Sequence, residues 1–521
     1  MMQLTRLARS LGILSAITLA GCKSLDIQNP NAPDAKRALS DPAALESVAS
    51  GTLRTWFNAY MADPATTLCT MANSCTASWN NDHMNYYSSI DADGTRLGRP
   101  YKNDLAAAER QEIEFAWFGM YSTLSSANDV LKAIRQNGLV ITDAATTKRS
   151  ETIAQLMQAA VLAEIAVNYD KGYIVTDSSD LASLTYSDRK ALRDAALKKF
   201  DAAIALATAN KFTTPTGWTN GISYDNTQFA RVGNTMAARL IASWPRNGTE
   251  NTAANWAQVA TYASNGMSTG VPFDFLFVGD GGNAWYNEFL SWFDDITSAR
   301  VHTRLAKMMD PVTQQDPWPG PPGNPQPHSL DKRLGNGTYG NASMVKGYGT
   351  IPTDAGAGTD FGFSGLAPFR PSRGQYHQSN IGFKRWDCDG LDDGNSIGNG
   401  YCPSPTFMAA QNDLLWAEAL LRTGGSLAQA ATLINKTRVT RGGLSAASAA
   451  DGVAGLMTKM YYEQEIELFG IPHAYYDNRR IDNLLAGTPH EMPVPAKELG
   501  VFGQALYTFG GTGLLNSPTP P

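Results

Sequence analysis

The clearest structural signal in this 521-residue chain is the segment Asp413-Leu414-Leu415-Trp416-Ala417-Glu418-Ala419-Leu420, which continues to Arg422 and is followed by Gly424-Gly425. Large apolar residues recur here every three to four positions, and the same period returns from Ser426 to Thr440. This spacing predicts two helices, at 412–422 and 426–440, joined by a tight glycine turn. Small alanines beside leucine and tryptophan let such helices approach closely as an antiparallel pair.

The same pattern occurs twice more upstream. Helices expected at 153–169 and 188–209 form one pair, and helices expected at 228–244 and 255–265 form another. Three such pairs resemble degenerate tetratricopeptide repeats, and the alternative is a set of unrelated amphipathic helices. The predicted fold class is therefore mainly α, with tetratricopeptide-like helix pairs as a scaffold.

The flanks of these pairs are less regular. Asp41-Pro42 supplies an N-cap and a first-turn proline for a helix, and apolar periodicity predicts another at 112–136. The stretch 61–110 is expected to be loop. Between 266 and 405 the helical pattern largely fails, and seven prolines fall within 311–327. We expect a large loop-rich insertion there, because a structureless stretch of this length is otherwise unusual in a compact domain.

Composition excludes several classes of function. Lys and Arg total 42 against 48 Asp and Glu, a net charge of −6, so the chain lacks the basic surplus of a nucleic-acid binder. Only 17% of the residues are charged, whereas 11 Trp and 20 Tyr are present. This balance predicts a surface that is polar but largely uncharged. No cofactor is expected.

The N-terminus predicts the compartment. Two basic residues, Arg6 and Arg9, precede an apolar run from Leu11 to Ala20, which is too short to span a bilayer but suits a signal peptide at 1–21. The run ends in Leu19-Ala20-Gly21-Cys22, which resembles a bacterial lipobox and predicts lipidation of Cys22. The alternative is an ordinary signal peptide followed by a chance cysteine. The mature chain would carry 40 basic and 48 acidic residues, a net charge of −8, and would begin with a polar tether at 22–40.

The other four cysteines fall into two local pairs. An oxidising envelope favours the disulfides Cys69–Cys75 and Cys388–Cys402. The rival is a four-cysteine zinc site, but neither pair has the usual two-residue spacing.

The C-terminal motifs resemble the SusD/RagB family of outer-membrane nutrient-binding lipoproteins. The matching stretches are Trp416 to Leu420 with Gly424, Leu433-Ile434-Asn435-Lys436-Thr437-Arg438, Tyr462 to Gly470, Tyr475 to Arg480, and Met492 to Leu499. The chain departs from the family pattern at Ile471-Pro472-His473, where an aromatic residue or Arg is usual, and 311–405 contains no matching motif.

The resemblance implies one unit made of a helical part at 41–265, the insertion at 266–405 and a closing part at 406–521. It implies that the helix-pair face caps a SusC-like TonB-dependent barrel transporter. It further implies loops that bind an oligosaccharide, a peptide or another nutrient, attachment to the outer membrane through the lipid at the cell surface, and no catalysis.

Loop aromatics and amides are the candidates for ligand contact. An aromatic ring can stack on the C–H face of a sugar while amides and carboxylates bind its hydroxyls. The candidates are Trp79, Asn80, Asn81, Asp82, Tyr86, Tyr87 and Trp318. For Trp79 and Trp318 a structural role remains an equal alternative. Tryptophans within helical patterns are expected in the core, namely Trp56, Trp117, Trp244, Trp256 and Trp416, as are Trp285, Phe289 and Trp292.

Other chemistry receives weaker support. The acid-dense loop with Asp387, Asp389, Asp392 and Asp393 is a weak calcium candidate without the EF-hand pattern. Glu463, Glu465 and Glu467 point apart on a helix, so a paired-carboxylate site is not expected. Gly335 to Gly340 spells GxGxxG, but no strand precedes it and no helix follows. The rival function is a surface glycoside hydrolase that uses Asp294, Asp295 or the loop 387–393.

Overall fold

The computed structural model describes residues 40–77, 103–107, 110–280, 284–293, 299–316, 325–335, 358–363, 377–383, 385–386, 403–485 and 488–507. Its helices are α3 (Pro42–Met61), α4 (Asp63–Met71), α5 (Gln111–Arg135), α6 (Ala144–Asn168), α7 (Arg189–Ala209), α8 (Asn226–Ser243), α9 (Gly248–Ala253), α10 (Trp256–Ala263), α11 (Glu288–Phe293), α12 (Thr303–Met309), α13 (Ala409–Arg422), α14 (Leu427–Arg438), α15 (Gly452–Glu467), α16 (Ala474–Arg480) and α17 (Ala496–Val501). Its strands are β1 (Cys75–Ala77), β2 (Lys171–Gly172), β3 (Ser187–Asp188), β4 (Phe275–Val278), β5 (Ala299–Val301), β6 (Phe361–Phe363), β7 (Ile381–Phe383) and β8 (Pro403–Phe407). Helices dominate, which confirms the prediction of a mainly α fold.

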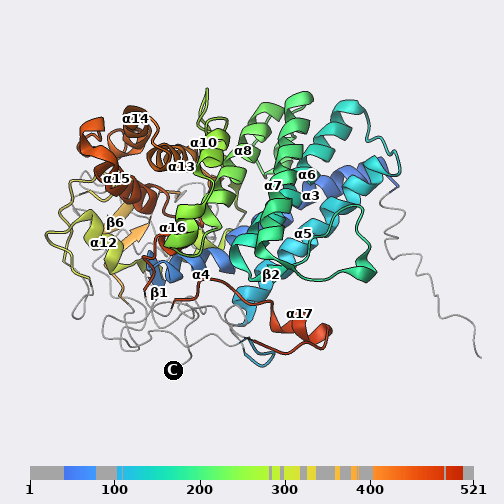
Figure 1. Cartoon of the computed structure of the whole chain (residues 1–521), viewed down its shortest axis with the longest axis horizontal. Helices are drawn as coiled ribbons and strands as arrows, with labels where there is room; N and C mark the ends of the chain where they lie inside the picture. The colour runs from blue at the N-terminus through green and yellow to red at the C-terminus, as the bar shows by residue number, and fades with distance from the viewer. Residues whose placement is uncertain are drawn as a thin grey trace, which may run out of the picture.

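The longer helices stand side by side in a row along the long axis of the molecule (Figure 1). In this row α3 packs on α5, α5 on α6, α6 on α7, α7 on α8, α8 on α10, α10 on α13, and α13 on α14. The three predicted pairs are therefore present as α6–α7, α8–α10 and α13–α14. The contact between α10 and α13 joins the second pair to the third across the segment that separates them in sequence.

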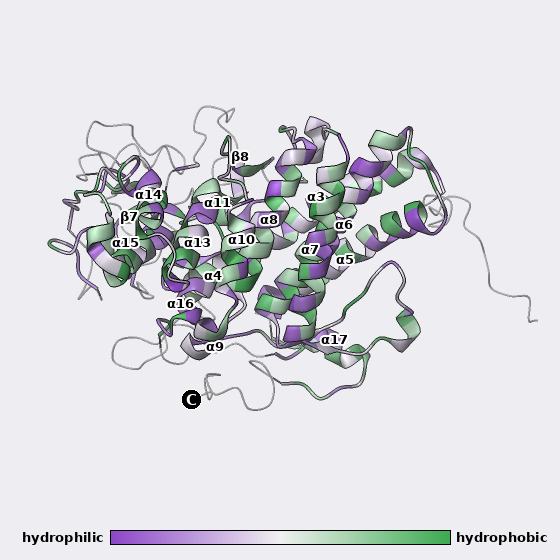
Figure 2. Ribbon diagram, turned by 45° about the horizontal axis from the view of Figure 1, so that its top comes forward, coloured by the Kyte–Doolittle hydropathy of each residue, from purple (hydrophilic) through white to green (hydrophobic). Residues whose placement is uncertain are grey.

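Helix α6 lies at the centre of the row, and its residues from Ser150 to Asn168 are all buried. A helix covered on every side can carry apolar residues all round. Its charged Glu164 is compensated, since it pairs with the buried Arg239 of α8 at 2.5 Å. The neighbouring helix α7 instead shows hydrophilic and hydrophobic residues on different sides (Figure 2), because only one stripe of it is buried.

The segment 266–405 is anchored to the helical row near both of its ends. Strand β4 pairs antiparallel with β8, and Phe275 lies opposite Phe407. Both rings belong to the main hydrophobic core, together with Trp56 of α3. The described residues between these strands form only short elements, namely α11, β5, α12, β6 and β7. The amphipathic stretch predicted at 285–293 contains α11, and Phe289 is buried as expected.

Three local expectations were wrong. The stretch 61–110 was expected to be loop, but α4 and β1 lie within it. Helix α6 begins at Ala144, well before the predicted start, because Asp143 caps it by accepting a hydrogen bond from Thr146 N at 2.7 Å. Trp244, Trp292 and Trp416 pack against the core but are only half-buried. The guanidiniums of Arg189 and Arg193 lie over the Trp244 ring, 3.9 and 4.3 Å from its centroid.

The motifs near the C-terminus meet in one buried ion pair. Arg480 NH2 donates to Glu418 Oε2 at 2.6 Å, and Arg480 NH1 donates to Glu418 Oε1. Burial raises the pKa of the Glu418 carboxyl, but the paired Arg480 and Arg422 outweigh it and hold that pKa below its ordinary value. The pair joins α13 to α16, so two motifs that lie 62 residues apart are one structural unit.

Arg479 connects the same segment to the helical row. Its guanidinium donates to Val167 O at 2.9 Å and to Ser243 O at 2.6 Å, near the C-terminal ends of α6 and α8. Carbonyls at helix ends lack partners within the helix and carry the negative end of its dipole, so an arginine there is stabilising.

Within the described residues, none of the helices combines the length and the apolar content that crossing a membrane requires.

Candidate ligand-binding site

The predicted ligand residues lie outside the described part of the chain. These are Trp79, Asn80, Asn81, Asp82, Tyr86, Tyr87 and Trp318. The same holds for Cys22, Cys388, Cys402, Asp294, Asp295, and the calcium candidates Asp387, Asp389, Asp392 and Asp393. The structure does describe the framework from which these segments start.

Strands β1 and β5 place two of the starting points side by side. They pair antiparallel with Ala77 opposite Ala299, so the segments that begin at 78 and end at 298 leave the framework at the same edge. Val301 O also accepts hydrogen bonds from Ser379 N at 3.3 Å and from Ser379 Oγ at 2.7 Å. The framework therefore brings together the ends of three segments that are far apart in sequence.

A disulfide fixes the turn that leads into β1. Cys69 of α4 and Cys75 of β1 are bonded, as predicted, with their Cα atoms 5.5 Å apart. Asn73 between them adopts a left-handed backbone with φ 51°, which asparagine tolerates better than most residues. The turn brings Ser74 N to Cys69 O at 3.1 Å. The covalent bond thus holds the direction in which the chain continues toward Trp79.

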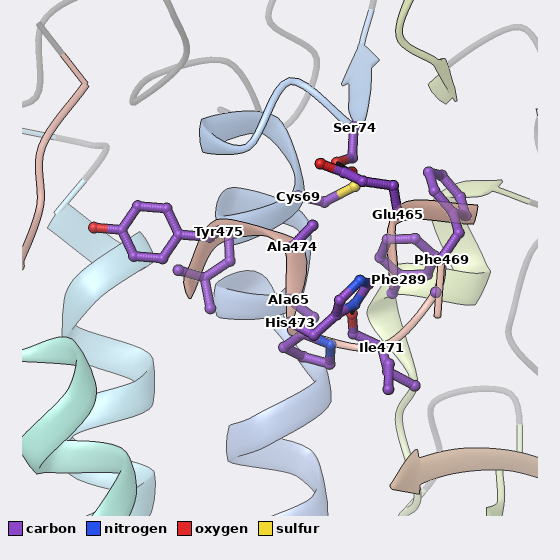
Figure 3. Close-up of a pocket in the computed structure, with 13 residues that line it drawn as sticks. Ala65, Cys69, Ser74, Phe289, Glu465, Phe469, Ile471, His473, Ala474 and Tyr475 are labelled. Atoms are coloured by element: carbon purple, nitrogen blue, oxygen red, sulfur yellow. Dashed lines mark hydrogen bonds between the residues drawn. The ribbon is translucent and has the colours of Figure 1, made fainter. Parts of the chain in front are cut away.

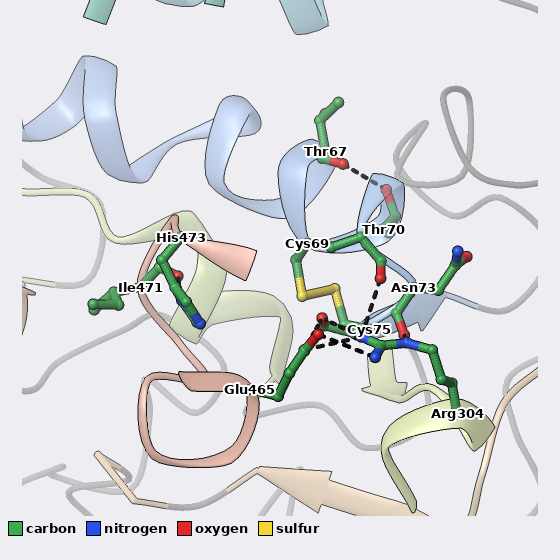
Figure 4. Close-up of a disulfide and its surroundings, with 11 residues drawn as sticks. Thr67, Cys69, Thr70, Asn73, Cys75, Arg304, Glu465, Ile471 and His473 are labelled. Carbon is green, nitrogen blue, oxygen red and sulfur yellow. Dashed lines mark hydrogen bonds and ion pairs between the residues drawn. A yellow bond between two sulfur atoms is a disulfide. The ribbon is translucent and has the colours of Figure 1, made fainter. Parts of the chain in front are cut away.

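Arg304 and Glu465 lie beside this disulfide (Figure 4). Their ion pair measures 2.9 Å between Arg304 NH2 and Glu465 Oε2. Arg304 also donates to Asn73 O at 2.9 Å and to Ala72 O at 3.1 Å, so α12 holds the turn through backbone carbonyls. On the other side, Asn478 Nδ2 donates to Glu465 Oε1 at 2.6 Å.

The electrostatics of Glu465 follow from these contacts. Burial raises the pKa of its carboxyl, but the charge and hydrogen bonds of Arg304 and the hydrogen bond from Asn478 outweigh burial, so the pKa lies below its ordinary value. The Glu465 carboxyl is thus ionised at neutral pH, and both of its oxygens accept hydrogen bonds. Its role is to hold three segments together, which makes it unsuited to act as a catalytic acid.

Hydrogen bonds also close the stem of the segment that carries Trp318. The buried carboxylate of Asp310 accepts from Thr313 N at 3.1 Å and from His328 N at 2.6 Å. Gln314 Nε2 donates to Pro325 O at 2.6 Å. Residues 310–314 and 325–328 are therefore tied together on both sides of 317–324.

A small cavity lies beneath the disulfide (Figure 3). Its volume of about 10 Å³ holds at most one water molecule, and Leu68, Phe289, Phe469 and Tyr475 are among its walls. It is too small for a ligand. Glu465, His473 and Ala474 separate it from a larger open pocket of about 370 Å³ between α12, α15 and α16.

His473 fixes the connection between α15 and α16. Its Nδ1 lies 2.9 Å from Ile471 O and its Nε2 lies 2.7 Å from Gln464 O. The imidazole is thus held between two backbone carbonyls of this connection. Ile471-Pro472-His473, where the chain departs from the SusD/RagB pattern, therefore still places a hydrogen-bonding side chain at this junction.

Sequence analysis did not identify Arg304, Glu465 or the open pocket as features of this region. The available signal was the spacing of Thr458, Tyr461, Tyr462 and Glu465, which puts these side chains on one face of α15. Glu463 and Glu467 lie on a different face and both contact the buried Arg333, at 2.7 and 3.1 Å. The expectation that all three glutamates point apart was therefore wrong for this pair, because residues four apart share a helix face. Within the described residues, no group of three His, Cys, Asp or Glu side chains is placed to hold a metal ion.

Comparison with known proteins identifies the fold. No protein-family model matches the chain, and no curated protein matches it. Among solved structures, a SusD superfamily protein from Bacteroides vulgatus has a TM-score of 0.53 and 12% identity, with 86% of this chain and 89% of that chain covered. A SusD-like carbohydrate-binding protein from Bacteroides fragilis has a TM-score of 0.54 and 11% identity, covering 85% and 86%. A structure with a xylogluco-oligosaccharide has a TM-score of 0.54 and 13% identity, covering 88% and 85%. These similarities show a shared fold over most of each chain.

Proposed function

The chain has a SusD-like fold, and on that premise we propose that it is a lipid-anchored, surface-exposed protein that binds an oligosaccharide. We propose further that it delivers this nutrient to a SusC-like, TonB-dependent transporter in the outer membrane. It acts by binding and not by catalysis. The three parts 41–265, 266–405 and 406–521 work as one unit.

The observation that carries this proposal is the fold match over most of the chain to a protein whose name is SusD-like carbohydrate-binding protein. A second match, over 88% of the chain, is to a structure with a xylogluco-oligosaccharide. The composition agrees, because a net charge of −6 with few charged residues favours a neutral ligand over a polyanion. A peptide is the alternative ligand.

The framework supports the proposed role of the loops. A binding loop must be held in place at its ends if its aromatic side chains are to meet a ligand without a large loss of conformational entropy. The disulfide Cys69–Cys75 and the β1–β5 pair hold the segment that begins at 78, and Asp310 closes the stem around 317–324. We therefore propose Trp79 and Trp318 as stacking residues, and Asn80, Asn81, Asp82, Tyr86 and Tyr87 as further contacts.

The test is titration calorimetry of the purified protein against neutral oligosaccharides, peptides and polyanions. We expect a neutral glycan to bind best, and Trp79→Ala and Trp318→Ala each to weaken it by about 1–3 kcal/mol, by analogy with aromatic stacking on bases. Phe115→Ala is the matched control, because Phe115 is 47% exposed on α5. Preference for a polyanion, or unchanged affinity in both tryptophan variants, would contradict the proposal. Release of shorter sugars from the glycan would instead favour the hydrolase with Asp294, Asp295 or the loop 387–393.

The proposed anchor has its own test. Growth with a fatty-acid analogue should label the protein, and Cys22→Ser should abolish the label, because the thioether needs that thiol. Cys69→Ser is a control that alters a cysteine already engaged in a disulfide. Labelling that persists in Cys22→Ser would contradict lipid attachment at this residue.

A further inference from the structure

We infer that the open pocket between α12, α15 and α16 is a second binding site, for a small neutral molecule rich in hydroxyl groups such as a monosaccharide or disaccharide. We call it the tyrosine pocket. Its lining residues are Met308, Thr458, Tyr461, Tyr462, Gln464, Glu465, His473, Ala474, Asp477, Asn478, Ile481 and Asn483. The proposed loop residues lie outside the described part of the chain, and the inference goes beyond the oligosaccharide site proposed above because it rests on these described residues alone.

Two helices build the walls of the tyrosine pocket by their periodicity. Thr458, Tyr461, Tyr462 and Glu465 follow the i, i+3, i+4, i+7 spacing on α15, so their side chains share one face. Residues 474, 477, 478 and 481 provide the facing wall at the same helical spacing. The volume of about 370 Å³ lies within the range of small-molecule sites, and rigid helices position the walls.

The rings of Tyr461 and Tyr462 are fixed and half-buried. Tyr462 donates from its hydroxyl to Asp331 Oδ2 at 2.7 Å, and Tyr461 accepts from Arg422 NH2 at 3.0 Å. The guanidiniums of Arg333 and Arg438 lie over the Tyr462 ring, 5.8 and 5.9 Å from its centroid. Among the described residues no cation lies over the Tyr461 ring, so Tyr461 is the better candidate to present an apolar face. An aromatic face of this kind packs against the C–H face of a sugar ring.

The polar atoms of the tyrosine pocket that remain without a hydrogen bond among the described residues are acceptors. Gln464 is only 3% exposed, yet its Oε1 is buried without a hydrogen-bond partner among the described residues, while its Nε2 donates to Glu418. Asp477 receives Arg480 through Oδ1 alone, and Asn483 uses its Nδ2 on Asn478 Oδ1. A buried acceptor left without a donor is costly, and a bound hydroxyl group would satisfy it.

The charges around the tyrosine pocket favour a neutral ligand. Among the described residues, no lysine or arginine lines it, and the carboxylates of Glu465 and Asp477 would repel an anion. His473 also lines it, but both of its ring nitrogens face backbone carbonyls. Both carboxylates already pair with arginines, Glu465 with Arg304 and Asp477 with Arg480, each at 2.9 Å. Their attraction for a cation is thereby largely cancelled. An uncharged molecule with several hydroxyl donors and one apolar face therefore suits the tyrosine pocket best.

The test uses titration calorimetry and saturation-transfer NMR of the purified full chain with glucose, xylose and galactose, and with glucuronate as the anionic counterpart. We expect one or more neutral sugars to bind and glucuronate to bind at least tenfold more weakly. Thr458→Trp should weaken the sugar at least tenfold by filling the mouth, since Thr458 is an exposed lining residue. Val453→Trp, also exposed on α15 but outside the lining, should leave affinity unchanged.

A second comparison separates this site from the loops. Binding of the monosaccharide should survive the double change Trp79→Ala, Trp318→Ala, whereas binding of the long oligosaccharide should not. Gln464→Met should weaken the monosaccharide severalfold with the circular dichroism retained. The inference is overturned if none of the sugars binds, if glucuronate binds best, or if Thr458→Trp has no effect while the double loop change abolishes binding.

Discussion

Arg304 of α12 and Glu465 of α15 form an ion pair of 2.9 Å between residues that lie 161 positions apart, and each also contacts the turn around the Cys69–Cys75 disulfide. One pair thus joins the insertion, the C-terminal helices and the segment that leads toward Trp79. Glu465 also lines both the small cavity beneath the disulfide and the tyrosine pocket. The proposed loop site and the tyrosine pocket therefore share a structural support.

Breaking this pair should destabilise the protein strongly. Arg304→Met leaves the buried Glu465 charge without its partner, and we expect a loss of about 3–5 kcal/mol in the free energy of unfolding, measured by urea denaturation. The matched control is Lys190→Met, which breaks the exposed i, i+4 pair with Asp194 and should cost less than about 1 kcal/mol. Equal losses in the two variants would show that Arg304 does not support the region.

The disulfide makes a separate contribution. Replacing Cys69 and Cys75 together by alanine opens a short covalent loop, so the unfolded chain gains conformational entropy. We therefore expect the free energy of unfolding to fall by about 2 kcal/mol. The measurement is urea denaturation with and without reductant. A reductant effect that remains in the double variant reports the predicted Cys388–Cys402 bond, and its absence would contradict that pairing.

His302 predicts a dependence of stability on pH. Burial, followed by the charges of His377 and Arg304, lowers the pKa of His302 well below its ordinary value of 6.5. Its Nδ1 accepts from Arg304 N at 2.9 Å, so the ring is neutral in the folded protein. The unfolded chain binds a proton as the pH falls through 6.5, so the contribution of His302 to stability is present above that pH and declines below it.

The variant His302→Asn retains an acceptor at the N-cap of α12 but cannot titrate. We expect the slope of unfolding free energy against pH, between about 6.5 and 5, to flatten by up to about 1.4 kcal/mol per pH unit. His328→Asn exchanges an exposed imidazole in the insertion and serves as the control. An unchanged slope in His302→Asn would show that His302 already carries a proton in the folded protein.

The helices could be predicted because their signals are local. Asp41 caps α3 by accepting from Ala43 N at 2.9 Å, as its position before Pro42 indicated. An Asp-Pro dipeptide also stands at 63–64, but there α4 begins at Asp63 itself and its N-cap, Ala62, has no side chain that can accept a hydrogen bond. The start of α4 thus lacks the capping signal that marks α3. Local capping residues and apolar periodicity are thus enough to predict most of the helices.

The contacts between distant segments could not be predicted. Arg333 is fully buried and pairs with Glu463, which lies 130 residues away, and neither residue has a local signal for the other. Arg304 similarly pairs with Glu465 because α12 and α15 both contact the turn around the Cys69–Cys75 disulfide. Periodicity states which face of a helix is buried, but it does not state which segment of an irregular insertion covers that face.

The last prediction concerns docking of the transporter on the helix-pair face. Stacked helix pairs build extended surfaces for partners, and each pair of the row offers small exposed residues. We place one charge on each pair, with Ala205→Glu on α7, Thr261→Glu on α10 and Thr432→Glu on α14. All three positions are exposed, so each change should alter stability by no more than about 0.5 kcal/mol.

The triple variant should lose co-purification with a large barrel protein after gentle detergent extraction, while its circular dichroism stays unchanged. Val312→Glu with Leu330→Glu is the control, because both residues are 88% exposed and belong to the insertion. That control should retain the partner. If the triple variant still co-purifies and the insertion variant does not, the transporter binds the insertion, and the orientation implied by the SusD/RagB resemblance must be reversed.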